Sequence, residues 1–239
     1  SSPVRASVVL PTYNEAQNLV ALVERIREVV PDIGILIVDD NSPDGTGAIA
    51  DECAARLSDV RVIHRPQKQG LGNAYRHAFD EVLTSGVDVV VTMDVDFSHD
   101  PEADAVVGSR YVPGGSTVNW PVHRRLLSKW GNLYTAAILG VGVRDCTSGF
   151  RAYRTSALSA IEPGRTRADG YAFLTELVLR LVRLGYRVGE VPIIFTERVH
   201  GKSKMSGRII AESMLLVTRW GVARRVRQLT RRSSGQRSR

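Results

Sequence analysis

The first hundred residues alternate between two kinds of apolar pattern. Short runs that are apolar at nearly every position are followed by longer stretches in which apolar residues return every three to four positions. Continuous apolar runs are typical of strands buried on both faces of a parallel sheet, and the longer stretches are typical of helices that cover it. The expected strands are 6–11, 33–40, 60–64 and 87–94, and the expected helices are 14–30, 44–57 and 70–83. This pattern predicts an α/β fold built on a parallel sheet.

The second half of the chain has a less regular pattern. It predicts, in order, a strand (105–108), a Gly/Pro-rich loop (112–121), a helix (125–139), a turn and strand (145–153), a helix (171–184), a strand (187–195) and a closing helix. The closing segment has a wide apolar face and an Arg-rich end, which fits a helix packed on the domain and a helix lying on acidic lipid equally well. We therefore divide the chain into a main domain (1–205), this helix (206–230) and a basic tail (231–239), which has no apolar residue and is expected to be disordered.

The chain is strongly basic, with a net charge of +7 and a pI of about 9.8. Such a balance favours an anionic partner, which could be an acidic membrane surface, a phosphorylated substrate or nucleic acid. Nucleic acid is the least favoured, because no aromatic side chains alternate with the arginines of the tail to stack on bases. The preferred interpretation is a peripheral position on an acidic membrane.

No membrane-spanning helix is expected, because the sequence contains no run of about twenty apolar residues. It also lacks the segments of a signal peptide. Cys53 and Cys146 lie far apart and outside any CxxC pattern, so we expect two buried thiols in a reducing compartment. These observations predict a cytoplasmic location.

Polar and acidic residues follow three of the expected strands at the point where each strand ends. The first strand runs into PTYNE (11–15), the second into DD (39–40) and the fourth into DVD (94–96). Ligands of open parallel sheets bind beyond the carboxyl ends of the strands. We therefore expect these three segments to share one binding site.

The aspartates in these segments suggest two kinds of binding. Asp94 and Asp96 are two residues apart on a strand, so their side chains point the same way, and two carboxylates this close repel unless a cation lies between them. Mg²⁺ or Mn²⁺ prefers such oxygen ligands, and the alternative is a solvated acidic turn. Of Asp39 and Asp40, one is expected to cap the following helix and the other to bind the base or ribose of a nucleotide.

Basic residues suited to phosphate lie in the second half of the chain. The stretch RVHGKSK (198–204) follows a strand directly, and it is either a solvated loop or a clamp that closes over an anionic substrate. Arg110, Arg124 and Ser128 are further side chains that could bind a phosphate.

Six motifs together resemble the inverting family 2 glycosyltransferases and, within them, the polyprenol- or dolichol-phosphate mannosyltransferases. They follow the family's order from about Ser7 to Met205: PTYNE (11–15), VDDNSPDGT (38–46), MDVDFSHDP (93–101), GSRY (108–111), DCTSGFRAY (145–153) and RVHGKSK (198–204). The resemblance implies a GT-A type fold, a Rossmann-like, mostly parallel sheet flanked by helices, with a C-terminal amphipathic helix. It also implies metal-dependent transfer of mannose from GDP-mannose to a polyprenyl (dolichyl-type) phosphate with inversion, for the assembly of lipid-linked glycans.

The resemblance implies roles for residues on the donor side. The guanine and ribose pocket would be lined by Pro11, Tyr13, Glu15, Asp39 and Asp40. The Mg²⁺ or Mn²⁺ on the donor diphosphate would be held by Asp94 and Asp96, with Ser98, where relatives often have Gln, as the third candidate ligand.

On the acceptor side, the resemblance implies that Arg110, Arg124 and Ser128 bind the acceptor's phosphate. Arg198 and Lys204 would lie on a flexible loop over the site, and with Asp96 and Arg110 they are the candidate catalytic residues. A phosphate monoester has a second pKa of about 6, so the nucleophile is largely anionic at neutral pH. The reaction therefore needs a well-positioned nucleophile more than a general base.

The expected partners are GDP-mannose, a polyprenyl phosphate and the cytoplasmic face of an acidic membrane, with a separate membrane-protein anchor as a further candidate and no nucleic acid. Two alternatives stay open. One is a glucosyl or N-acetylhexosaminyl transferase of the same fold that uses a UDP-sugar, and the other is a non-catalytic, receiver-like binding domain. The second is disfavoured, because receiver domains carry their aspartate pair after the first strand, whereas Asp39 and Asp40 follow the second.

The chain departs from the family between the fourth and fifth expected strands. Only residues 103–105 separate Glu102 from Val106, where relatives carry a whole helix. Either the helix has been deleted here or a stretch is missing from the sequence between these strands; we favour the second, because loss of the helix would uncover one face of the sheet.

Overall fold

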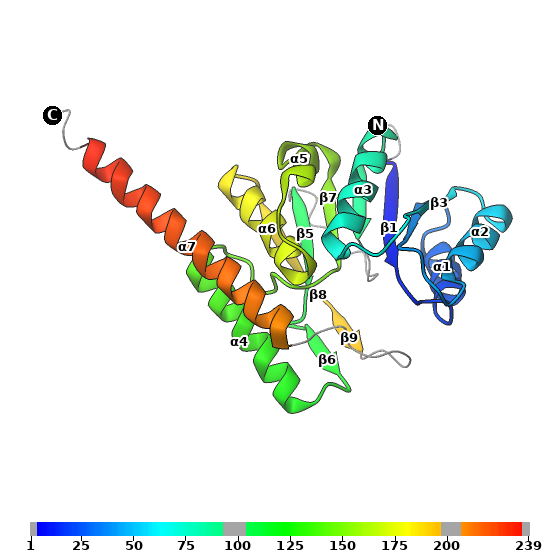
Figure 1. Ribbon diagram of the computed structural model, residues 1–239, viewed down its shortest axis with the longest axis horizontal. Coiled ribbons are helices and arrows are strands. Elements are labelled where there is room, and N and C mark those ends of the chain that lie inside the picture. Colours follow the sequence, from blue (N-terminus) through cyan, green and yellow to red (C-terminus); the bar gives the residue numbers. More distant parts are fainter. Residues whose placement is uncertain (1–3, 93–103, 197–206, 236–239) are drawn as a thin grey trace.

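The computed structural model describes residues 4–92, 104–196 and 207–235 of the chain. A central sheet has helices on both sides, and a second, smaller pair of strands lies next to it (Figure 1). Two long helices, α4 (Val122–Leu139) and α7 (Gly207–Gly235), lie side by side at one end of the molecule. The predicted α/β class is therefore confirmed.

The central sheet has seven strands and is mostly parallel. Their order across the sheet is β3 (Val60–His64), β2 (Gly34–Asp39), β1 (Ala6–Thr12), β4 (Val89–Thr92), β7 (Arg151–Arg154), β5 (Ala105–Ser109) and β8 (Val188–Pro192). Among the strands of the described residues, only β7 runs antiparallel to its neighbours, β4 and β5. The carboxyl ends of the other strands therefore meet at one edge of the sheet.

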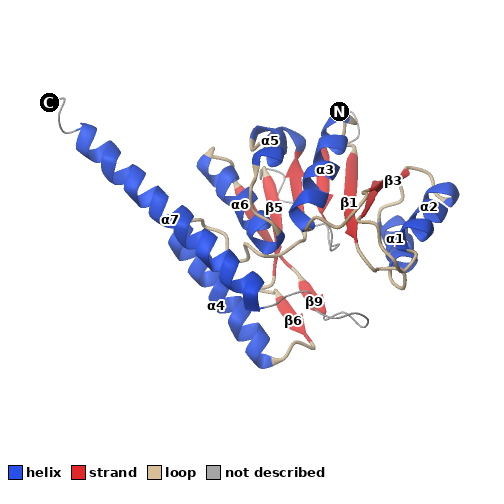
Figure 2. Cartoon of the chain, viewed as in Figure 1, coloured by secondary structure: helices blue, strands red, loops and turns tan. Residues whose placement is uncertain are grey.

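Helices cover both faces of this sheet (Figure 2). On one face α1 (Leu19–Val29) and α2 (Thr46–Arg56) pack on Val8 and its neighbours. On the other face α3 (Leu71–Thr84) and α6 (Gly170–Arg183) pack on Val9 and its neighbours, together with the short α5 (Thr155–Ala160). Adjacent residues of β1 thus point into different cores, which explains why the strand is apolar at nearly every position.

Some elements differ from the sequence prediction. The first helix begins at Leu19, not at residue 14, because Asn14 has a positive φ of 57° and cannot continue a right-handed helix. The expected strand 145–153 is ordered as a strand only in β7, after a loop. The expected strand 187–195 is interrupted at Ile193, and its second part, β9 (Ile194–Thr196), pairs with β6 (Ser116–Val118) from the expected Gly/Pro-rich loop.

The C-terminal helix α7 packs on the domain along part of its length. Tyr134 and Thr218 join α4 to α7 through their hydroxyl groups, 2.8 Å apart, and Arg224 donates a hydrogen bond to the Leu139 carbonyl. Val217 is 2% exposed and lies in a core cluster with α4 and α6. The helix extends to Gly235, past residue 230 where we expected it to end, and the disorder of the tail stays a prediction. Within the described ranges no helix is long and apolar enough to cross a membrane.

The sheet is not left open where the sequence lacks a helix of its relatives. Val91, Ala152 and Val106 stand side by side across β4, β7 and β5, and they are only 0%, 8% and 7% exposed. Val91 and Ala152 belong to a core cluster that also contains Phe150 and Ile193. Among the described residues this part of the sheet is therefore buried, and the reason for favouring a missing stretch does not hold for these strands. Both cysteines are buried free thiols, as expected.

Candidate active site

The carboxyl ends of β1, β2 and β3 form the first half of the site. Thr12, Asp39 and His64 are paired residues across these three strands. The Asp39 carboxylate is 2% exposed and accepts hydrogen bonds from the Ser42 hydroxyl at 2.5 Å, the Ser42 backbone N–H at 3.1 Å and the Thr12 hydroxyl at 3.3 Å. Asp39 therefore fixes the turn that follows β2.

Asp40 has a different environment. It is 5% exposed, and its Oδ1 accepts a hydrogen bond from the guanidinium of buried Arg65, which also donates to Gln69. Burial raises the pKa of the Asp40 carboxyl, although the charge of Arg65 acts in the opposite direction. Its Oδ2 accepts no hydrogen bond from any described residue, so this oxygen remains available for a ligand donor.

The loop after β1 is tied to the start of α2. The Thr46 hydroxyl accepts a hydrogen bond from the Glu15 backbone N–H at 3.0 Å, and Asp44 accepts one from the Ala16 backbone N–H at 3.2 Å. Asp44 also accepts two hydrogen bonds from Thr46. Burial alone would raise the pKa of Asp44, but these hydrogen bonds to Thr46 and Ala16 outweigh it and hold the pKa below its ordinary value.

Two other predicted donor-side residues lie at the end of β1 and directly after it. Pro11 is half-buried next to Val38, and the Tyr13 ring has the ammonium of Lys68 3.9 Å from its centroid. A polar cleft of about 350 Å³ lies between the end of β3 and α3, and it is lined by Arg65, the partner of Asp40, and by Gln69 and Arg76 among others. Gly70, at a φ of +92°, precedes α3 and confirms the predicted helix start there.

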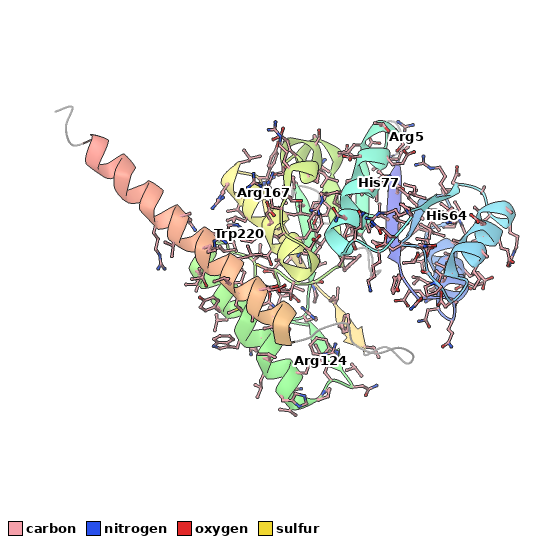
Figure 3. The ribbon with its side chains drawn as sticks, viewed as in Figure 1. Arg5, His64, His77, Arg124, Arg167 and Trp220 are labelled. Atoms are coloured by element: carbon pink, nitrogen blue, oxygen red, sulfur yellow. The ribbon has the colours of Figure 1, made fainter. Side chains whose placement is uncertain are left out.

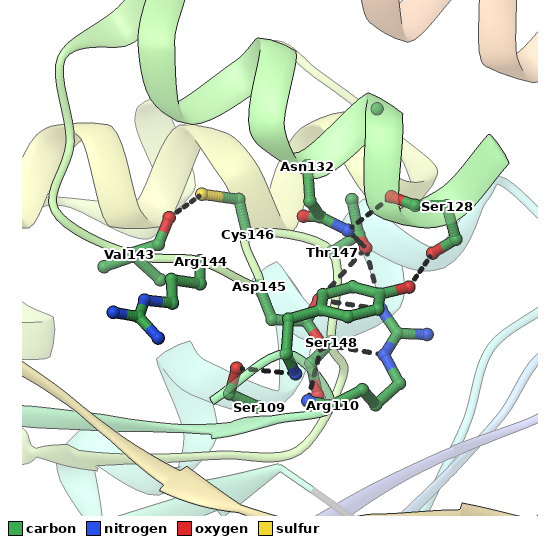
Figure 4. A network of polar contacts seen from close by, with 12 residues as sticks. Ser109, Arg110, Ser128, Asn132, Val143, Arg144, Asp145, Cys146, Thr147 and Ser148 are labelled. Carbon is green, nitrogen blue, oxygen red and sulfur yellow. Dashed lines mark hydrogen bonds and ion pairs between the residues drawn. The ribbon is translucent and has the colours of Figure 1, made fainter. Parts of the chain in front are cut away.

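The second half of the site is built around Arg110, directly after β5 (Figure 4). Its guanidinium donates two hydrogen bonds of 2.7 Å to the fully buried carboxylate of Asp145, and a third of 2.9 Å to the Thr147 hydroxyl. This bidentate arrangement fixes the orientation of the guanidinium plane. The loop 145–148 therefore holds Arg110 at the carboxyl edge of the sheet.

Arg124 and Ser128, on α4, join the same cluster. The guanidinium carbons of Arg110 and Arg124 lie 5.4 Å and 4.4 Å from the Trp120 ring, and Figure 3 shows Arg124 close to β6. The Tyr111 hydroxyl donates a 2.6 Å hydrogen bond to the Ser128 hydroxyl. The indole N–H of Trp120 is buried and has no hydrogen-bond partner among the described residues. Two cations and a free buried donor in one cluster are suited to an anion.

A groove between α4 and α7 opens beside this cluster. Arg124 and Ser128 line it together with apolar side chains of both helices, namely Leu127, Met214 and Val217. The groove thus combines a cationic and hydroxyl-bearing part with an apolar part, which suits an amphiphilic ligand with an anionic head.

The loop that carries Asp145 is fixed from behind by Arg151. This side chain is fully buried, and its guanidinium donates to the carbonyl oxygens of Ser148, Cys146 and Leu174 at 2.6–2.7 Å. On the other side, a Cβ at Gly108 would overlap the Phe150 ring, so only glycine fits before Ser109 and Arg110. Burial raises the pKa of the Cys146 thiol to about 12, so it stays protonated.

Five predicted site residues lie outside the described residues: Asp94, Asp96, Ser98, Arg198 and Lys204. The last described residue before the aspartates is Thr92, at the end of β4. In the described part of the chain no three His, Cys, Asp or Glu side chains are grouped so that they could hold a metal. The metal site therefore stays a prediction that rests on Asp94 and Asp96.

Some residues of the site were not assigned a role from the sequence. Arg65 pairs with Asp40 from 25 positions away, and Asp145 pairs with Arg110 from 35 positions away. No local pattern reveals such pairs. Asp145 does lie in the motif DCTSGFRAY, and this motif was the signal that the sequence offered. Trp120 lies close to Arg124 in the sequence, which was a second, weaker signal.

The chain is similar in sequence to known proteins over most of its length. Residues 7–162 match the family described as Glycosyl transferase family 2. An undecaprenyl-phosphate mannosyltransferase of Micrococcus luteus is 47% identical over 233 residues, covering 93% of this chain and 96% of the relative. A polyprenol monophosphomannose synthase of Mycolicibacterium smegmatis is 48% identical over 235 residues, covering 93% and 89%.

Solved structures share the fold at low sequence identity. Glucosyl-3-phosphoglycerate synthase of Mycobacterium tuberculosis, in complex with Mn²⁺, UDP-glucose and phosphoglyceric acid, superposes with a TM-score of 0.63 at 19% identity, covering 91% of this chain and 80% of that one. Mannosyl-3-phosphoglycerate synthase of Rubrobacter xylanophilus gives a TM-score of 0.58 at 21% identity, covering 95% and 75%. At these identities the likeness shows the fold alone.

Proposed function

The chain belongs to glycosyl transferase family 2, and from this premise we propose that it transfers mannose from GDP-mannose to a polyprenyl phosphate with inversion at the sugar carbon. The observation that carries the acceptor side is the cluster of Arg110, Arg124 and Ser128 around Trp120, beside a groove with an apolar wall. The two mannosyltransferase relatives, which match over most of their length, support the choice of sugar and of lipid.

The donor would be bound at the ends of β1 and β2. The open carboxylate oxygen of Asp40 can accept hydrogen bonds from the ring N–H and amino group of guanine, whereas uracil offers a single ring N–H. Asp39 has its hydrogen bonds within the protein, so it would shape the pocket rather than bind the base. Pro11, Tyr13 and Glu15 would line the same pocket.

In the reaction, an oxygen of the lipid phosphate attacks the anomeric carbon of mannose. The bond from that carbon to the diphosphate breaks, and GDP leaves with the electron pair. Arg110 is held in a fixed plane by Asp145, and Arg124 is held against Trp120, so both would orient the phosphate for attack from the face opposite the leaving group.

A divalent cation, Mg²⁺ or Mn²⁺, bound by Asp94 and Asp96 with Ser98 as third candidate ligand, would stabilise the negative charge that develops on the leaving diphosphate. The two aspartates come directly after β4, which lies between the donor end of β1 and the strands that lead to Arg110. Arg198 and Lys204 would supply further positive charge. The enzyme would act at the cytoplasmic face of the membrane.

The test is a transfer assay with purified protein, labelled GDP-mannose and polyprenyl phosphate, with and without a chelator. We expect transfer that requires the cation and that Asp96→Ala abolishes, whereas Asp32→Ala, an exposed residue at the opposite edge of the sheet, leaves it unchanged. Competition by UDP-sugars in the same assay tests the choice of nucleotide. No transfer of sugar to polyprenyl phosphate from any nucleotide sugar would overturn the proposal.

The acceptor residues are tested by kinetics. Arg124→Ala is expected to raise the KM for polyprenyl phosphate about tenfold or more while leaving the KM for GDP-mannose unchanged, because it removes a charged hydrogen-bond donor from the anion. An equal rise of both constants would argue against a phosphate role for Arg124.

A further inference from the structure

Helix α4 carries a stripe of large apolar side chains that face solvent. Val122, Leu126, Trp130 and Leu133 are 60%, 61%, 56% and 68% exposed, and Ala137 is also exposed. At about 100° per residue, all five lie in one sector of about 80° around the helix axis. Isolated exposed apolar residues are ordinary, but a continuous stripe that includes a tryptophan marks an interaction surface.

The stripe is bordered by basic residues. Lys129 and Arg125 are exposed on one side of it, and His123 is exposed on the other. An apolar face with a basic border is typical of a helix that lies in the plane of a membrane interface, with the apolar side chains among the acyl chains and the cations at acidic headgroups. Tryptophan is also enriched at this depth of a bilayer.

The opposite side of α4 faces the candidate site. Arg124, Ser128 and Asn132 lie about 160° to 240° from the middle of the stripe at the same rise per residue, and they contact Trp120, Tyr111 and the loop 145–148. One helix therefore presents one face to solvent and the other to the acceptor cluster.

Helix α7 is a weaker candidate for the same role in its described part. Its exposed apolar residues Leu215 and Val222 are seven positions apart, and the exposed Arg219 lies in the same sector between them. Other apolar residues of α7, such as Val217, are buried against the domain.

We propose that the α4 stripe is the surface by which the protein docks on a bilayer that contains acidic lipids. The choice of a lipid occupant rests on the proposed function, in which the acceptor is itself a lipid. A second copy of the chain fits less well, because pairing two stripes would bring two sets of basic residues together on molecules with a net charge of +7. Docking would place the groove between α4 and α7 at the membrane surface.

The first experiment measures binding of the full chain to vesicles of equimolar phosphatidylcholine and phosphatidylglycerol by flotation. The triple variant Leu126→Ser, Trp130→Ser, Leu133→Ser is expected to bind at least about tenfold more weakly, since three side chains no longer enter the acyl region. The matched control is Leu184→Ser, a leucine 58% exposed at the end of α6, which should bind like the wild type. Wild-type binding by the triple variant would overturn the proposal.

The second experiment locates the contact without disturbing the stripe. The chain has three tryptophans, Trp120, Trp130 and Trp220. Vesicles with brominated acyl chains quench the fluorescence of a tryptophan that enters the bilayer. We expect the fluorescence of the wild type to be quenched, and we expect the conservative variant Trp130→Phe to lose this quenching. Quenching that persists in Trp130→Phe and is lost in Trp220→Phe would assign docking to α7 and overturn the proposal.

Two further measurements separate this inference from its alternatives. With a short-chain, water-soluble prenyl phosphate as acceptor, the triple variant should transfer sugar at the wild-type rate, because its site is intact. If the wild type binds vesicles through Trp130 but transfers nothing, the proposed function fails and the docking surface stands. If sedimentation shows a dimer that the triple variant dissociates, and neither protein binds vesicles, the stripe is a contact between copies and the proposal falls.

Discussion

Arg151 carries a buried positive charge, and its guanidinium group donates hydrogen bonds to backbone carbonyl groups. Its three guanidinium nitrogens each donate to a different carbonyl, two in the loop 146–148 and one in α6. Removing such a charge-assisted network leaves buried carbonyl groups without partners, at about 1–3 kcal/mol each. Arg151 therefore fixes the loop that holds Arg110, together with Glu190, which accepts hydrogen bonds from the Arg144 and Asp145 backbone N–H groups.

This dependence leads to the first prediction. Arg151→Lys keeps the charge but replaces the planar group with a compact ammonium, which cannot reach three carbonyls in these directions. We expect it to lower the free energy of unfolding by about 2–4 kcal/mol, measured by urea denaturation. The control is Arg25→Lys on the exposed surface of α1, where the change should stay within about 0.5 kcal/mol. Equal effects in both variants would contradict a special role for Arg151.

Asp44 provides a pH-dependent test of the hydrogen bonds that tie the loop after β1 to the start of α2. Its pKa is lowered in the folded protein, so the carboxylate stabilises the fold above the ordinary value of 3.8, and this stabilisation is lost as the pH falls through the lowered pKa. In Asp44→Asn, an amide N–H₂ group faces the Ala16 N–H or the Thr46 donors. We therefore expect the variant to melt below the wild type at neutral pH, and the difference in Tm to vanish in acid. A difference independent of pH would contradict this account.

At the scale of elements, the strands were predictable because a strand that is buried on both faces is apolar at nearly every position, and the local sequence displays this pattern. The direction of β7 was not, since a strand of four residues pairs according to what packs around it rather than by its own pattern. The start of α1 was missed because residues 14–18 contain no Gly or Pro, whereas the positive φ of Asn14 and the hydrogen bonds from this loop to Asp44 and Thr46 depend on the tertiary structure. The site followed the same rule: strand-end residues were predictable, and long-range pairs such as Arg110 and Asp145 were not.

The contact between α4 and α7 gives a prediction for these two helices. A Cβ at Gly221 would overlap Ile138 and lie 2.9 Å from its carbonyl oxygen, whereas a Cβ at Gly131, in the middle of α4, meets nothing within 4 Å. Gly221→Ala should therefore destabilise the protein by about 1–3 kcal/mol by pushing the helices apart. Gly131→Ala should stabilise it by up to about 1 kcal/mol, because it only removes backbone freedom. In thermal melts, we expect Gly221→Ala to lower the Tm and Gly131→Ala to raise it. If both variants shift the Tm in the same direction, this account of the contact is wrong.

At the scale of the whole molecule, the two halves of the site lie on either side of β4. The half proposed to bind the donor is at the ends of β1, β2 and β3, and the half proposed to bind the acceptor is built from the end of β5 together with α4. A sugar passed from one half to the other would cross the region beyond β4, which is where the sequence places Asp94 and Asp96. The strand order thus separates the proposed binding region for the sugar donor from that for the acceptor.

The net charge of +7 leads to the last prediction. If acidic headgroups attract the whole molecule, vesicle binding should weaken steeply with salt, since the Debye length falls from about 10 Å at 0.1 M to about 3 Å at 1 M. Binding should not vanish, because burial of apolar side chains is not screened. Vesicles of phosphatidylcholine alone serve as the control and should show little salt dependence. Salt-independent binding to the acidic vesicles would exclude an electrostatic contribution.

The tight contact at Gly108 also has a consequence for how the sequence of this enzyme can change over time. The space that a methyl group would need there is filled by the Phe150 ring, in a different motif 42 positions along the chain. A homologue with alanine at the first position should therefore carry a smaller residue at the second. The two sites should covary across the family, and a single exchange at either should be rare.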